Sequence, residues 1–168
     1  MKITSLINDL IDLMGVKSQG IEHYRQYSLV PIFIINLLLV AASSTILDSR
    51  ESLALDLVIS IALTLINVIF LMYWFGRVNI KHSFLTFLHF DIVLGIAAHI
   101  PYLAILVVMN YFDSMPLIGF LAGLSAICYV IYMVSLNYAQ ATKSLDSYAF
   151  IGVLIVITFQ FVTELLLI

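Results

Sequence analysis

The third of five long apolar runs in the chain carries most of the polar side chains that could do chemistry inside a membrane. It holds His89, Asp91 and His99, and ionisable groups at membrane depth are costly enough to be functional candidates by default. Asn67, on the second run, lies near the expected depth of His99. One interpretation is a proton or ion relay. The other, which we favour, is a polar stripe that faces the interior of a helix bundle and is held there by hydrogen bonds.

A second candidate site is a pair of acids, Asp56 and Glu164, which we expect at similar depth near the opposite membrane surface. Arg50 is close enough in sequence to neutralise one of them. The pair could form a cation-binding vestibule, or it could be two interfacial acids exposed to headgroups and water, which we favour. Two carboxylates without further ligands make a poor metal site, so we expect no metal and no cofactor.

Small residues four apart form a third candidate, on the fourth run. Gly119 and Gly123 would let two helix backbones approach closely. The contact would be either a dimer seam or, as we favour, a packing seam within the bundle. The lone Cys128 cannot form an internal disulfide, and we expect it to be a small core residue.

Signatures of soluble enzymes are absent from the sequence. It contains no P-loop, no Gly-x-Gly-x-x-Gly, no His-Glu-x-x-His and no Gly-x-Ser-x-Gly. The net charge is −3 and no basic stripe is present, which argues against a nucleic-acid partner. We therefore expect a protein that is not an enzyme, with the lipid bilayer and either other proteins or a second copy as its partners.

The elements that would position these residues follow from composition. The chain has 168 residues, of which 63% are hydrophobic and 10% charged, whereas soluble domains are about half apolar and a quarter charged. Each apolar run has roughly the 20 residues that a helix needs to cross a bilayer. The runs lie at 29–47, 53–76, 84–112, 116–138 and 148–168.

These runs predict an all-α integral membrane protein built as a five-helix bundle, because short connections between long helices imply antiparallel neighbours. The third run is long and is expected to be tilted, or broken near Pro101. Aromatic residues cluster at the ends of the runs, among them Tyr73, Trp74 and Tyr148. We interpret them as an interfacial belt.

Residues 1–28 form a separate N-terminal segment. Apolar residues recur at helical spacing over residues 6–14, with Asn8, Asp9 and Asp12 on the polar face and Gly15 as a stop. This predicts a short amphipathic helix. Helices on lipid surfaces usually carry lysine and arginine on that face, so docking onto lipid and docking onto protein both remain open.

Lysine and arginine predict the orientation. One side of the predicted bundle holds six of these residues and the other holds only Arg50: the six are Lys2, Lys17, Arg25, Arg77, Lys81 and Lys143. Basic residues concentrate in cytoplasmic loops. We therefore expect a cytoplasmic N-terminus and, after five spans, a C-terminus outside the cell or in a lumen.

From about residue 73 to its end, the chain resembles the Yip family of Rab-GTPase-interacting membrane proteins. The resemblance rests on Phe75-Gly76-Arg77 followed by Ser83-Phe84, on Gly95-Ile96-Ala97-Ala98-His99-Ile100-Pro101, and on Tyr138-Ala139-Gln140-Ala141-Thr142-Lys143. Five spans and a cytoplasmic N-terminus also match the family's plan. The short N-terminal segment lacks the acidic-tyrosine-glycine-proline motif of the eukaryotic branch, so the chain looks more like a shorter bacterial member.

The resemblance implies a membrane scaffold or adaptor that acts through helix packing and partner contacts, in membrane trafficking or envelope organisation. Two other functions stay open. One is a small transporter or ion-coupled subunit that uses Asp91 and His99. The other is an accessory subunit of a larger membrane complex.

Overall fold

The computed structural model describes residues 3–46, 53–111 and 116–167, and these residues form helices joined by short connections. The order along the chain is α1 (Ile3–Met14), the 3-10 helix η1 (Ile21–Gln26), α2 (Leu29–Ile46), α3 (Leu53–Gly76), α4 (Phe84–Tyr111), α5 (Pro116–Thr142) and α6 (Asp146–Leu167).

Within the described part of the chain, four helices, α2 to α5, are long and apolar enough to cross a membrane. Their lengths run from 18 residues in α2 to 28 in α4, and at 1.5 Å per residue α4 is about 42 Å long. The prediction of an all-α membrane protein is thus supported. The described apolar part of α6, Asp146–Gln160, is shorter.

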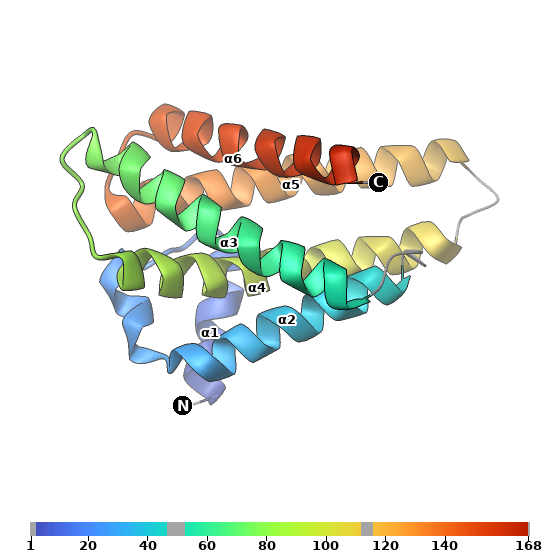
Figure 1. Ribbon diagram of the computed structural model, residues 1–168, viewed down its shortest axis with the longest axis horizontal. Coiled ribbons are helices and arrows are strands. Elements are labelled where there is room, and N and C mark those ends of the chain that lie inside the picture. The colour runs from blue at the N-terminus through green and yellow to red at the C-terminus, as the bar shows by residue number, and fades with distance from the viewer. Residues whose placement is uncertain (1–2, 47–52, 112–115, 168) are drawn as a thin grey trace.

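Helix α4 is the central element. It packs against α2, α3 and α5, and α6 packs against α5 and α3. Helices α2 to α6 alternate in direction along the long axis of the bundle (Figure 1). Helix α1 crosses this axis at a steep angle and contacts α4 and α5 (Figure 1). We call the end of the bundle with α1, η1 and the connections 77–83 and 143–145 the near end. The far end is where α2 and α4 finish and α3 and α5 begin.

The core lies toward the near end. It gathers aromatic side chains that are almost fully buried: Tyr24, Phe75, Phe87, Phe90 and Tyr138. Toward the far end α5 is largely uncovered by the rest of the chain, with Leu117 69% and Phe120 65% exposed. A bilayer can cover such side chains because lipid tails are apolar.

Two helix boundaries differ from the expected runs. Helix α5 continues to Thr142, past the expected end at Tyr138, because the polar residues of its last turn bond within the protein: Thr142 Oγ1 donates to the Tyr138 carbonyl at 2.6 Å. Helix α4 is continuous through Pro101, since membrane-spanning helices tolerate proline where neighbouring groups satisfy the freed backbone carbonyl. Its start is capped by Ser83, whose Oγ accepts from the Thr86 amide at 3.2 Å.

Candidate functional site

Asp91 of α4 and Tyr138 of α5 form a polar pair between these two helices. The Tyr138 hydroxyl donates to Asp91 Oδ1 at 2.7 Å. Aromatic rings enclose the tyrosine: the Phe75 ring stacks on it at 5.7 Å between centroids, and the Phe90 ring meets it edge-on at 4.9 Å. Tyr138 is fully buried and Asp91 partly so. The low dielectric around the rings strengthens the hydrogen bond and makes loss of either partner costly.

The other predicted polar residues of α4 bond within their own helix. His99 Nδ1 donates to the Gly95 carbonyl at 2.8 Å, and His89 Nδ1 donates to the Leu85 carbonyl at 2.7 Å. A carbonyl oxygen only accepts, so Nδ1 carries the proton in both rings. Asn67 is buried on α3. Among the described contacts, none joins His89, Asp91, His99 and Asn67 into a single cluster, and the relay stays a prediction.

Asn36 of α2 is a buried polar residue that the sequence analysis missed. Its side chain is 5% exposed, and among the described residues its Oδ1 has no hydrogen-bond partner. A Cβ on Gly95 would lie 3.4 Å from that oxygen. The glycine thus lets α2 and α4 approach closely. The available signal was a neutral amide within an otherwise apolar run.

Side chains of α5 hold the C-terminal end of α1. The last carbonyls of a helix lack partners within the helix. Here Asn137 Nδ2 donates to the Leu13 carbonyl at 2.8 Å, and the Tyr129 hydroxyl donates to the Met14 carbonyl at 2.9 Å. Gln140 Nε2 donates to the Val16 carbonyl at 3.0 Å. Since the three donors are spaced by eight and three residues, they share one face of α5.

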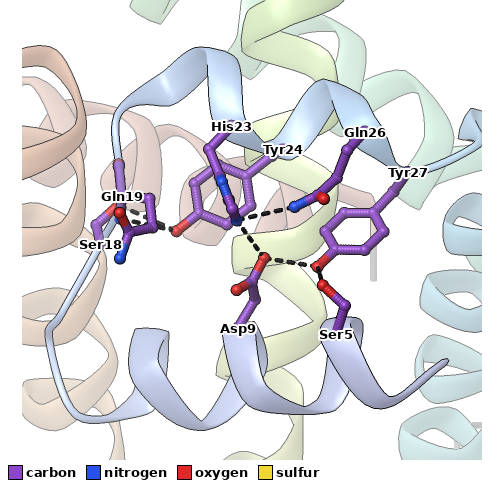
Figure 2. Close-up of polar contacts among 8 residues, drawn as sticks. All are labelled: Ser5, Asp9, Ser18, Gln19, His23, Tyr24, Gln26 and Tyr27. Atoms are coloured by element: carbon purple, nitrogen blue, oxygen red, sulfur yellow. Dashed lines mark hydrogen bonds and ion pairs between the residues drawn. The ribbon is translucent and has the colours of Figure 1, made fainter. Parts of the chain in front are cut away.

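The carboxylate of Asp9 ties α1 to η1 and to the residue that follows it. Its Oδ2 accepts from the Tyr27 hydroxyl at 2.6 Å and from His23 Nε2 at 2.8 Å (Figure 2). Burial and then the hydrogen bond to Asp9 raise the pKa of Tyr27 to about 12. The N-terminal segment is therefore a folded unit with internal bonds.

Glu22 of η1 ties this unit to the start of α4. Its carboxylate accepts from His82 Nδ1 at 2.9 Å and from Thr86 Oγ1 at 3.2 Å, and Arg25 lies 3.7 Å away. Burial acts to raise the pKa of Glu22, but the bonds from His82 and Thr86 and the neighbouring charges outweigh it and hold the pKa below its ordinary value.

Trp74 and Tyr148 clasp α3 to α6. Trp74 Nε1 donates to the Tyr148 carbonyl at 3.1 Å, the Tyr148 hydroxyl donates to the Trp74 carbonyl at 2.6 Å, and their rings stack at 4.8 Å. The indole lies over Gly152, where an added Cβ would stand 2.7 Å from it. Of the expected aromatic belt, Tyr73 is 68% exposed, but Trp74 and Tyr148 join helices.

The other two predicted sites are the acidic pair and the glycine seam. Asp56 is partly exposed in the first turn of α3, whereas Arg50 and the side chain of Glu164 lie outside the described residues. A Cβ on Gly119 would meet nothing within 4 Å, and one on Gly123 would meet the Met109 side chain at 3.5 Å. The packing seam and the dimer seam therefore both stay predictions.

Cys128 is exposed on α5, so its expected place in the core is wrong. The error arises because the residue lies on the part of α5 that the rest of the chain leaves largely uncovered. Within the described part of the chain, no group of three or more His, Cys, Asp or Glu side chains could hold a metal ion.

No protein-family model, curated protein or solved structure matches the chain. The resemblance to the Yip family accordingly stays a prediction.

Proposed function

We propose that the chain is a non-enzymatic membrane scaffold or adaptor whose near end binds partner proteins. The observation that carries this proposal is the attachment of the N-terminal segment: Tyr129, Asn137 and Gln140 bond the end of α1. A segment held in this way has a fixed shape before it meets a partner, so binding loses less conformational entropy. The Yip-like role in membrane trafficking or envelope organisation belongs to the same proposal.

The near-end surface has the mixed chemistry of a protein-binding face. The side chains of Glu22 and Arg25 are 55% and 52% exposed, and Lys17, in the connection between α1 and η1, is also exposed. In the connection between α5 and α6, Leu145 is 76% exposed. Charges around isolated apolar side chains suit a protein partner, with the charges setting specificity and association rate.

The proposal includes five spans and a cytoplasmic N-terminus. Helix α6 has 22 residues, about 33 Å at 1.5 Å per residue, which is enough to cross a hydrocarbon core. It runs from the near end toward the far end beside α5 (Figure 1). Four spans would put the chain termini on one side, and five put them on opposite sides.

Affinity purification from native membranes in mild detergent tests the adaptor role. We expect the wild-type chain to bring down a defined set of proteins, and the charge-reversed Lys17→Glu/Arg25→Glu variant to lose them. Leu124→Ala is the matched control, because Leu124 is 48% exposed on the outer half of α5 and outside the proposed face. Recovery of the same proteins with the wild type, the double variant and the control would contradict the near-end proposal. Recovery of the wild-type chain without any other protein would contradict an adaptor role.

A reporter fused after residue 168 tests the topology independently. A phosphatase fusion is active only outside the cytoplasm, and a fluorescent-protein fusion reports the opposite side. We expect activity from the phosphatase fusion. Fluorescence at the C-terminus together with a cytoplasmic N-terminus would leave four spans.

Transport is a second candidate function, favoured by the partly buried carboxylate of Asp91 between α4 and α5. Its described partner is the neutral hydroxyl of Tyr138, and a carboxylate without a counter-charge in a bundle can take up a proton or a cation. Solute flux in proteoliposomes that disappears in Asp91→Asn or His99→Ala would favour transport. If stability and flux are both unchanged in the two variants, this candidate fails.

A role as an accessory subunit would appear in the purification above as a fixed stoichiometry with larger membrane proteins.

A further inference from the structure

Helix α1 has three distinct faces. Leu6, Leu10 and Leu13 are buried against the bundle, at 4%, 9% and 0% exposure. A second row, which we call the isoleucine row, consists of Ile3, Ile7 and Ile11, and these are 66%, 49% and 57% exposed.

The third face of α1 is polar and points toward the near end. Ser5 and Asp9 project from α1 toward η1, where they meet Tyr27 and His23 (Figure 2). In Figure 1, η1 lies on the near-end side of α1. Successive residues of an α-helix are about 100° apart, so Ile7 lies about 160° around the axis from Asp9. The isoleucine row therefore points the opposite way, along the apolar helices toward the far end.

We propose that α1 lies in the plane of the bilayer at the edge of its hydrocarbon core, with the isoleucine row in the acyl chains of one leaflet. The leucines bind the bundle, the isoleucines bind lipid, and Ser5 and Asp9 bond η1 on the headgroup side. Helices that lie in an interface divide their apolar and polar residues in this way. The face of α1 that points along the membrane-spanning helices is the one without charge.

Lipid is the occupant because the isoleucine row lies at the level where an exposed apolar helix, long enough to cross a membrane, begins (Figure 1). Val30 and Ile34 begin α2 and are 68% and 50% exposed, and α2 starts at the level of α1 (Figure 1). Exposure to water would cost about 25 cal/mol for each Å² of apolar surface. The polar face is acidic, so hydrophobic burial and the bonds from α5, and not attraction to anionic lipid, hold the helix in place.

The proposal also sets the depth of the Asp91 pair. Asn137 bonds the end of α1, and the next residue, Tyr138, bonds Asp91. The pair and α1 are therefore at the same level of the bundle. Asp91 then lies at the hydrocarbon edge and not at the bilayer centre, whereas His99, eight residues further along α4, lies about 12 Å deeper.

Site-directed spin labelling in liposomes tests this placement. Single labels at Ile3→Cys and Ile7→Cys, in a Cys128→Ser background, are compared with labels at Asn8→Cys and Gln19→Cys, two exposed polar positions. Oxygen concentrates in acyl chains, and a water-soluble nickel chelate stays outside them. We expect the ratio of oxygen to nickel accessibility to be several-fold higher at positions 3 and 7 than at 8 and 19.

Two results would overturn the proposal. Equal nickel accessibility at positions 3, 7 and 8 would place the isoleucine row in water. Low accessibility to both reagents at positions 3 and 7 would place the row against protein, in a second copy of the chain. Because the purified chain is used without partners, failure here is separate from failure of the adaptor role.

Discussion

The two ends of the bundle are built on different principles. At the near end, aromatic side chains are buried and hydrogen bonds join α1, η1, α3, α4, α5 and α6. Toward the far end, exposed apolar residues dominate α5 before Tyr129, including Leu117 and Phe120, and α4 exposes Val107 and Val108. The protein therefore specifies its own packing at one end and leaves much of the other to lipid.

The difference shows where helix contacts gain specificity in a membrane. Lipid tails are as apolar as leucine, so apolar contact between helices brings little advantage over contact with lipid. Aromatic stacking and hydrogen bonds do distinguish one neighbour from another. The near end has both, and we expect substitutions there to dominate stability.

The largest expected effect is from Phe75→Ala. The Phe75 ring is fully buried and stacks on Phe87 and Tyr138, so its removal should lower the free energy of unfolding by about 3–5 kcal/mol. Phe120→Ala, at a ring that is 65% exposed, should change it by less than about 0.5 kcal/mol. Titration with a denaturing detergent measures both, and equal losses would erase the contrast between the ends.

Tyr138→Phe should have the next largest effect. It removes the hydroxyl that donates to the partly buried Asp91, and an acceptor shielded from water that loses its donor costs about 1–3 kcal/mol. The control is Tyr132→Phe, whose ring is 57% exposed and which we expect to be neutral. Combining Tyr138→Phe with Asp91→Asn measures the coupling, and strict additivity of the two losses would mean that the bond does not stabilise the fold.

Gly152→Ala at the near end and Gly119→Ala at the far end compare how much room each end leaves for an added methyl group. The new Cβ would stand 2.7 Å from the Trp74 indole, and overpacking of this kind costs about 1–3 kcal/mol. The loosened clasp should also shift tryptophan fluorescence, which reports Trp74 alone because the chain has one tryptophan. Gly119→Ala, where the Cβ would meet nothing within 4 Å, should preserve both stability and emission.

The last expected effect is a loss of stability at alkaline pH that comes from one residue of the near end. The pKa of Tyr27 is about 12 in the folded chain and 10 as an ordinary tyrosine. Its contribution is therefore complete below pH 10 and is lost as the pH rises toward 12, with a slope of at most about 1.4 kcal/mol per pH unit. Tyr27→Phe should have a flatter profile between pH 10 and 11.5, and parallel profiles would assign the loss to other groups.

Most of the helices could be predicted because long apolar runs have few solutions in a membrane. A stretch of twenty such residues must satisfy its own backbone hydrogen bonds, and a helix does so. The boundaries of the helices are harder to predict: α5 ends at Thr142 and not at Tyr138. There, polar residues that usually mark a loop bond other parts of the fold.

The partners in the candidate site could not be predicted in the same way. Hydropathy gives the depth of Asp91, but its pairing with Tyr138 depends on how α4 and α5 rotate about their axes. Trp74 and Tyr148 suit an interfacial belt and a helix clasp equally well by position. The attachment of α1 is less visible still, because its acceptors are backbone carbonyls of Leu13, Met14 and Val16, which leave no mark in the sequence.

The crossing direction of α1 has a mechanical consequence. A helix of 12 residues is about 18 Å long, and in the proposed position it widens the protein in one leaflet only. A wedge of this shape relieves packing stress where that leaflet bulges outward and adds stress where the membrane is flat. We expect the chain to concentrate in small, strongly bent vesicles over large ones, provided that α1 faces their outer leaflet, and sorting between vesicles of two sizes measures this preference.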